Sequence, residues 1–338
     1  MIRLAIDVGS QTTKIYMLGS GVVLSEATSV AIETIETENG VVANVKAYGD
    51  TARSILGKGS PSTTVINPVD EGDIISEELL SALLTYFLQK IEINRKKAKD
   101  TEVMFVIPCG ATSTLKQKYL SVAEECNLGR VYFTQSPFAS VLGHNVNLSQ
   151  AKPMFALAVG YGVTNISAVS LDGIISGFSL NLGGGNVDVH LMDYIAENCS
   201  LKIGALTAER LKNTVGSLFE DDNKLAVIDG MEIKKGVPAS VAVNSSQILD
   251  LIKLYADKIL EYVSLAIAKL PAEVVATIVH DGIYLSGGFT RLDGFAEYVQ
   301  NKLSMPVNVC EDARYASVIG AGIILSSDNL TSLLATLD

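Results

Sequence analysis

Two segments far apart in the chain share one pattern: a short apolar strand, a glycine turn with hydroxyl residues, and a second strand. The first segment is residues 3–16 and the second is residues 154–170. Glycine lets a backbone approach a ligand closely, and successive turn amides form an anion-binding concavity, so each turn is a candidate phosphate site. The pair predicts two related domains that bind one polyphosphate from opposite sides.

The elements around the two turns repeat in the same order, which indicates an internal duplication of an α/β unit. Residues 31–70 are turn-rich and predict a small subdomain. The longest amphipathic helix is expected to begin after Ser245 or Ser246 and to end before Pro271. The expected strands are 3–7, 13–17, 21–25, 102–107, 131–134, 154–159, 165–170, 173–182 and 282–286, and the expected helices are 77–92, 112–126, 136–143, 188–198, 207–217, 246–269, one from about Leu292 and a final one with Gly320 and Gly322.

Composition and charge narrow the class of protein. The net charge of −11 argues against nucleic acid as a partner. The four cysteines and three histidines are dispersed, so we expect neither a zinc site nor a disulfide framework. A strand near Met1 and the lack of an apolar run of about 20 residues predict no signal peptide and no membrane span, hence a cytoplasmic protein. The basic stretch 90–99 is interpreted as a solvated loop or as a peripheral contact for an anionic membrane.

The motifs together resemble the actin-like ATPase superfamily, which includes actin, heat-shock chaperone ATPases and sugar kinases. Within it they are most similar to MreB, the bacterial actin homologue, and the resemblance runs nearly end to end. It rests on residues 7–14 and 160–164 for phosphate, 282–290 for adenosine, and the intervening stretches 67–74, 203–212 and 236–243.

The resemblance implies an α/β fold of duplicated ribonuclease H-like domains, with four subdomains and a nucleotide cleft between the halves. It implies ATP or ADP and Mg²⁺ as ligands, and head-to-tail polymerisation into protofilaments that pair and contact the inner face of the plasma membrane. The expected role is cytoskeletal: cell shape, positioning or motility. The implied boundaries are 1–31, 71–146 and 313–338 for subdomain IA, 32–70 for IB, 147–179 and 248–312 for IIA, and 180–247 for IIB.

The same resemblance assigns roles to individual residues. Asp7 is expected to position hydrated Mg²⁺ through water, since Mg²⁺ keeps several waters and needs few carboxylates. Two local alternatives stay open: Lys14 faces solvent, and Glu209 and Lys212 form an exposed i,i+3 ion pair. Phosphate ligands are expected from Gly9, Ser10, Gln11, Thr12, Thr13, Lys14, Gly160, Tyr161, Gly162, Val163 and Thr164, and nucleoside contacts from Glu209, Lys212, Gly287, Gly288 and Phe289.

Two positions depart from the family pattern in the residues that serve hydrolysis. The family places an aspartate where this chain has Ala158, and a glutamate or glutamine where it has Ser136. Gln135 is a candidate water-orienting substitute, although one residue of offset at a helix start turns a side chain by about 100°. Because positioning and electrostatics supply most phosphoryl-transfer catalysis, the sequence predicts nucleotide binding, weak or absent ATP hydrolysis, and weakened Mg²⁺ binding.

Several alternatives for function and partners stay open. The chain is a subunit that copolymerises with an active paralogue, a monomeric nucleotide-dependent switch, or a small-molecule kinase of the same superfamily. A kinase needs a catalytic base and usually long insertions, and the sequence offers neither. The leucine stripe at 330–337 docks on its own domain, on a partner or on a membrane.

Overall fold

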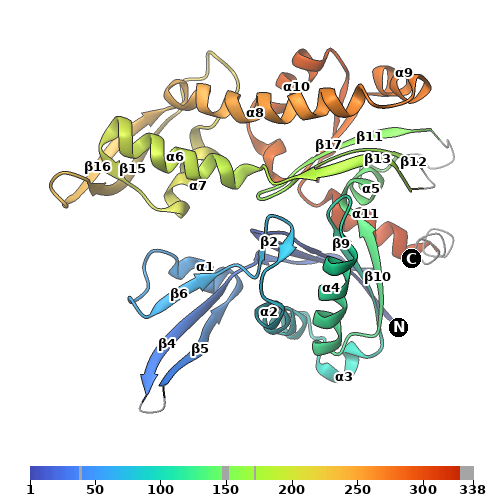
Figure 1. The fold of residues 1–338 in the computed structure, drawn as a ribbon, viewed down its shortest axis with the longest axis horizontal. Coiled ribbons are helices and arrows are strands. Elements are labelled where there is room, and N and C mark those ends of the chain that lie inside the picture. The colour runs from blue at the N-terminus through green and yellow to red at the C-terminus, as the bar shows by residue number, and fades with distance from the viewer. Residues whose placement is uncertain (38–39, 147–151, 171–172, 328–338) are drawn as a thin grey trace.

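The computed structural model describes residues 1–338 apart from 38–39, 147–151, 171–172 and 328–338, and it has two halves, each built on a five-stranded sheet (Figure 1). The predicted leucine stripe of the tail lies outside the described residues. Within the described residues, no helix combines the length and the apolarity that crossing a bilayer requires.

The two five-stranded sheets have the same topology. In each, a central strand pairs antiparallel with the next strand of a meander and parallel with a later strand of the chain. This repetition confirms the predicted duplication. The first sheet has the order β10-β9-β1-β2-β3, with β1 (Ile2–Val8), β2 (Thr12–Met17), β3 (Gly21–Ala27), β9 (Thr101–Ile107) and β10 (Arg130–Gln135); the second has the order β13-β12-β11-β17-β18, with β11 (Met154–Val159), β12 (Thr164–Ser170), β13 (Gly173–Leu180), β17 (Ile283–Ser286) and β18 (Val307–Val309).

Helices cover the outer faces of both sheets, and one pair lies between them. Each outer layer forms its own apolar core with its sheet, because its apolar residues recur at helical spacing. Between the sheets, α5 (Ser136–Leu142) packs against α11 (Ala316–Ser326), and a third core joins the halves there (Figure 1). The other helices are α2 (Glu77–Lys90), α3 (Arg95–Ala98), α4 (Ser113–Glu125), α6 (Gly184–Cys199), α7 (Ala205–Val215), α8 (Ser245–Ile267), α9 (Ala272–Asp281), the 3₁₀ turn η1 (Gly288–Arg291) and α10 (Phe295–Leu303).

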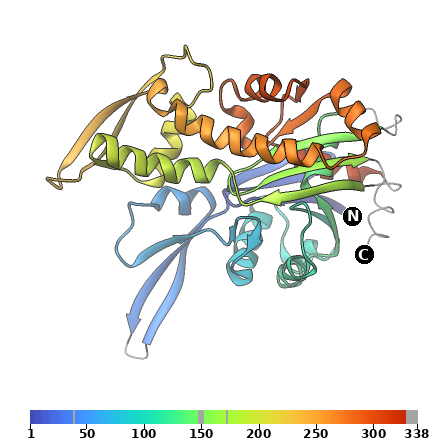
Figure 2. The same ribbon diagram turned by 45° about the horizontal axis from the view of Figure 1, so that its top comes forward.

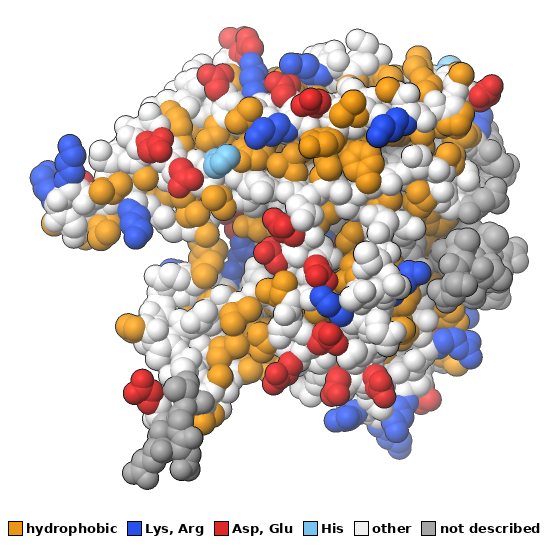
Figure 3. All heavy atoms as spheres, viewed as in Figure 1, with side chains coloured by type: hydrophobic (Ala, Val, Ile, Leu, Met, Phe, Trp, Pro, Cys, Tyr) orange, Lys and Arg blue, Asp and Glu red, His pale blue; other side chains and the backbone are white. Residues whose placement is uncertain are grey.

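A small three-stranded sheet extends from each half on the same side of the molecule (Figure 2). The space-filling view shows the surface hollowed between these two extensions (Figure 3). The chain boundaries of the four subdomains stay a prediction. One small sheet consists of β4 (Val30–Thr37), β5 (Gly40–Tyr48) and β6 (Thr63–Ile66) with helix α1 (Gly49–Ile55), and the other of β14 (Leu201–Lys202), β15 (Leu225–Glu232) and β16 (Pro238–Asn244); β7 (Val69–Asp70) and β8 (Asp73–Ile74) form a two-stranded pair.

Three local expectations were wrong. Helix α8 is capped by Asn244, whose side chain accepts a hydrogen bond from the Ser246 amide, so neither Ser245 nor Ser246 is the cap. The helix expected from about Leu292 begins at Phe295, because a 3₁₀ turn precedes it. The basic stretch contains a helical turn, α3, which Asn94 caps through hydrogen bonds from two backbone amides.

Candidate functional site

Two adjoining chambers lie in the cleft between the halves. The first chamber is lined by both glycine turns and by the start of α5, with Asp7, Lys14, Ala158 and Ser317 among its residues. The second chamber is lined by α7 and by the segment that follows β17. The residues that line both chambers are Gln11, Gly160, Tyr161, Gly288 and Arg314.

The two glycine turns face each other across the first chamber, as the sequence predicted. Each turn is closed by the same backbone hydrogen bond, from Gly9 to the Thr12 carbonyl at 3.2 Å and from Gly160 to the Val163 carbonyl at 2.9 Å. A Cβ on Gly162 would lie 2.7 Å from the Ser10 hydroxyl, so this position leaves no room for a side chain. Two loops of backbone amides at such close approach form an anion-binding concavity.

Two of the predicted phosphate ligands turn their hydroxyls away from the chamber. Thr13 is fully buried and its hydroxyl lies 2.9 Å from that of Thr28. Thr164 is also fully buried and donates to the Leu182 carbonyl at 2.6 Å. Successive side chains of a strand point to opposite faces, and Thr13 shares the inward face of β2 with Ile15. The hydroxyls of Thr13 and Thr164 therefore hold the turns and do not reach a ligand.

Lys14 does not face solvent. Its ammonium lies 3.0 Å from the Asp7 carboxylate, and both side chains line the first chamber. Asp7 is the one carboxylate among the described residues that line this chamber. Mg²⁺ sites in proteins use one or two carboxylates, and here the ion would have to displace the Lys14 ammonium from Asp7, so the donor set does not fit the ion. The chamber's amides and cations do fit a polyphosphate.

The positions expected to serve hydrolysis lie where the resemblance places them, but they carry no acid. Ala158, 5% exposed, and Ser136 both line the first chamber. The Ser136 hydroxyl lies 3.2 Å from the Ser317 hydroxyl. Gln135 is not among the lining residues, and its side-chain oxygen accepts a hydrogen bond from the Gly110 amide at 2.9 Å. The structure thus gives Gln135 a different partner from the water that we expected.

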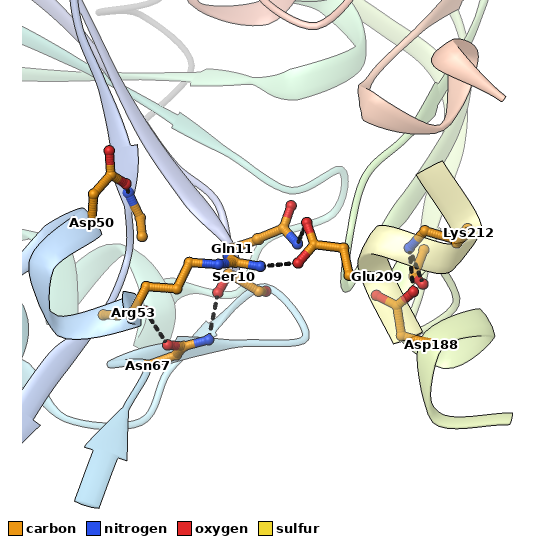
Figure 4. Close-up of polar contacts among 11 residues, drawn as sticks. Ser10, Gln11, Asp50, Arg53, Asn67, Asp188, Glu209 and Lys212 are labelled. Atoms are coloured by element: carbon orange, nitrogen blue, oxygen red, sulfur yellow. Dashed lines mark hydrogen bonds and ion pairs between the residues drawn. The ribbon is translucent and has the colours of Figure 1, made fainter. Parts of the chain in front are cut away.

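Glu209 connects the two halves across the cleft (Figure 4). One carboxylate oxygen accepts a hydrogen bond from the Gln11 side chain at 2.9 Å, and the other pairs with Arg53 of α1. Glu209 and Lys212 therefore do not pair with each other, which corrects the alternative of a local ion pair. The side chain of Asn67 also holds the first glycine turn, because it donates a hydrogen bond to the Ser10 carbonyl at 3.1 Å.

Lys212 is buried and pairs with Asp188 of α6. The ammonium lies 2.8 Å from Asp188 Oδ1 and donates to the Gly184 carbonyl at 2.7 Å. Asp188 is 1% exposed, and neither carboxylate oxygen has a hydrogen bond of ordinary geometry within the described residues. Burial is the main cause that raises the pKa of Asp188, to about 6, and the attraction of Lys212 opposes it.

This carboxyl makes the unfolding free energy depend on pH in a specific window. A raised pKa means that the folded chain binds this proton more tightly than the unfolded chain, so the contribution of Asp188 to the unfolding free energy falls as pH rises from 4 to 6 and is flat above. We expect the stability of the wild type, relative to Asp188→Asn, to fall by about 3 kcal/mol across the window. Urea unfolding at several pH values measures it, and Asp193→Asn, on the exposed face of α6, is the control. A constant difference between the two proteins would contradict the assignment.

The glycines after β17 have different roles. Gly287 has a φ of +92°, and a Cβ there would lie 2.2 Å from the Val159 carbonyl, so the strand backbone requires this glycine. Gly287 also lines the first chamber, so its contact with a nucleotide stays a prediction. Gly288 faces open space and lines both chambers. Phe289 is buried, packs edge-on against Phe295 and lines the second chamber.

The sequence analysis missed four residues that shape the site: Arg53, Asn67, Asp188 and Arg314. A signal existed for Asp188, because an acid on the apolar stripe of a helix, beside Val187 and three residues before Leu191, requires a buried partner. The others lie in segments whose spacing shows no periodicity, and their roles depend on contacts far apart in sequence.

A duplicated α/β fold with two glycine turns facing one chamber defines an actin-like protein. Residues 1–332 match the model of the MreB/Mbl protein family, and the chain belongs to that family. The chain is 28% identical to the cell shape-determining protein MreB of Escherichia coli, over 94% of this chain and 92% of the relative. It is 27% identical to the cell shape-determining protein Mbl of Bacillus subtilis, over 98% and 97%.

Solved structures share the fold. The ADP-bound crystal structure of MreB5 of Spiroplasma citri covers 96% of both chains with a TM-score of 0.87 at 23% identity. The form of that protein bound to AMPPNP gives 0.89. The double helical filament of MamK gives a TM-score of 0.76 at 20% identity, over 96% of this chain and 99% of that one.

Proposed function

We propose that this chain is a nucleotide-binding bacterial actin homologue that polymerises head to tail into cytoskeletal protofilaments for cell shape, positioning or motility, with weak or absent ATP hydrolysis. The observation that carries the proposal is the pair of glycine turns that face each other across one chamber, with Gly162 against Ser10. Family membership, the nucleotides in the MreB5 structures and the MamK filament support it.

We infer one orientation for the nucleotide, with its phosphates in the first chamber and its nucleoside in the second. The first chamber offers turn amides, Lys14 and Arg314 to the phosphates, and the second offers Glu209, Lys212 and the open space at Gly288 to the nucleoside. Hydrolysis needs a group that orients the attacking water and carboxylates that organise charge. Ala158 supplies no polar atom, and Ser136 supplies only a hydroxyl, so this chain binds its nucleotide and turns it over poorly.

Sedimentation of the purified protein tests the proposal. We expect pelleting with ATP or AMPPNP, less with ADP or no nucleotide, and little phosphate release in the same tubes. Fast phosphate release would contradict the hydrolysis part. Clear nucleotide binding without pelleting in any state would contradict the filament part and favour the monomeric switch.

We extend the proposal to two partners, each testable as a further arm of the same experiment. Because acids are absent at Ala158 and Ser136, the chain copolymerises with a paralogue that retains them, and an equimolar mixture should then pellet a larger fraction of this chain than pellets when it is alone. Peripheral contact at the inner face of the plasma membrane would use α3, where Lys96 and Lys97 are exposed. Anionic vesicles should retain the protein at low salt, and neutral vesicles should not.

A further inference from the structure

Arg314 occupies the junction of the two chambers and was not expected from the sequence. It lies two residues before α11 and lines both chambers. Its backbone is held on both sides: the Gly287 amide donates to the Ala313 carbonyl at 2.9 Å, and the Tyr315 amide donates to the Asp312 carbonyl at 2.7 Å. The segment that carries the guanidinium is thereby attached to the glycine turn after β17.

No acid among the described residues pairs with Arg314. Its one interaction within the described part of the chain is with the Tyr315 ring, whose centroid lies 5.6 Å from the guanidinium carbon. Within the described residues, the other charged groups that line the chambers have partners of opposite sign, except Arg291, which is exposed and lines only the second chamber. These pairs are Lys14 with Asp7, Lys212 with Asp188, Glu209 with Arg53, and Asp293 with Lys224.

The first chamber consequently has an excess of positive charge. Asp7 and Lys14 neutralise each other at 3.0 Å, and Ala158 and Ser136 contribute no charge, which leaves the guanidinium of Arg314. A chamber rich in carboxylates needs a divalent cation between its acids and the phosphates of a nucleotide. This chamber has no such need, and its donor set does not fit Mg²⁺.

We propose that Arg314 supplies in this chain the positive charge that a divalent cation would otherwise bring to the phosphates, so that nucleotide binding does not depend on Mg²⁺. The inference rests on the proposed function, because it concerns the same nucleotide. A guanidinium is suited to this role because it is planar, always charged and presents five donors, which bind phosphate oxygens in pairs. Its half-buried position between the glycine turns and the nucleoside chamber limits screening by solvent.

Calorimetric titration with ATP and with adenosine tests this, in Mg²⁺ and in EDTA. For the wild type we expect the two ATP affinities to agree within about threefold. Arg314→Gln should weaken ATP binding in EDTA by about 10- to 100-fold, the range of one charge-assisted contact, and leave adenosine binding unchanged. Added Mg²⁺ should restore part of that loss. Arg314→Lys keeps the charge without the planar donors and should be intermediate. Arg210→Gln, an exposed arginine of α7 that lines neither chamber, is the control.

The outcomes separate this inference from the proposed function. ATP binding by the wild type in Mg²⁺ but not in EDTA would overturn the inference and leave the proposed function standing. Absence of ATP binding in both would overturn the nucleotide part of the proposed function itself. An equal loss of ATP and adenosine affinity in Arg314→Gln would overturn the assignment to the phosphates. A second variant, Ala158→Asp, adds a negative charge to the first chamber. It should make ATP binding stronger in Mg²⁺ than in EDTA. Equal affinities in the two conditions would contradict the inference.

Discussion

Replacing Ala158 by Asp and Ser136 by Glu in one protein is expected to raise ATP turnover by about 100-fold or more, the effect that a single preorganised polar group has on such reactions. Both positions line the first chamber, so the new carboxylates would face the phosphates directly. The carboxylate introduced at position 136 would accept a hydrogen bond from the attacking water, and the one at position 158 would restore the acid that the resemblance implies there. Phosphate release at saturating ATP and Mg²⁺ measures the change.

The matched control replaces Ala158 by Asn and Ser136 by Met. These side chains have about the size of the two acids but carry no charge, and Met cannot orient a water, so turnover should stay near that of the wild type. Each variant is first shown to bind ATP and to unfold cooperatively, because Ala158 is nearly buried and a charge there costs stability. A folded, ATP-binding double-acid variant that remains inert would show that missing carboxylates are not the reason for slow hydrolysis.

Gly320→Ala is expected to destabilise the protein by about 3 kcal/mol or more, at the upper end for an added methyl group because the obstacle is backbone. A Cβ on Gly320 of α11 would lie 1.7 Å from the Ala139 carbonyl of α5. The contact is reciprocal, since a Cβ on Gly143 would lie 2.1 Å from the Ala316 carbonyl. The helices cannot move apart easily, because both sheets enclose them. The urea midpoint of unfolding measures the loss.

Gly204→Ala provides the comparison for this substitution. Gly204 precedes α7, has a φ of −94°, and a Cβ there would contact nothing within 4 Å. We expect its stability to stay within about 1 kcal/mol of the wild type, the size of a capping preference. Equal urea midpoints for Gly320→Ala and the wild type would mean that α5 and α11 do not pack as tightly as described.

Much of the fold followed from periodicity because local pattern and burial agree. Residues of α2 at 80, 83, 84, 87 and 88 are buried, as the helical spacing of its leucines and Phe87 indicates. Side chains of β2 alternate between the two faces of the sheet. Thr13 lies two residues before the core residue Ile15 and therefore on the same buried face. The expectation for Thr13 failed because it used residue type and ignored side-chain direction.

The site was less predictable, since its polar contacts join residues far apart in the chain. Gln11 and Glu209 are 198 positions apart, and Arg53 and Glu209 are 156 apart. No spacing rule relates such residues, so Glu209 could be placed near a nucleoside only by resemblance. Gln135 shows the converse limit: its chemistry suits a water, but the backbone at Gly110 takes its oxygen.

The place of α5 and α11 between the sheets determines how the cleft can open. Each helix begins beside the first chamber, α5 with Ser136 and α11 with Ser317 in its first turn, and the two pack where the halves join. Rotation of one half about this pair moves an atom in proportion to its distance from the pair, and α1 and α7 lie well away from it (Figure 1). Such a hinge rotation would therefore separate Arg53 and Glu209 widely and would move the surroundings of Ser136 and Ser317 little. The end that we propose to bind phosphate is the last to be uncovered.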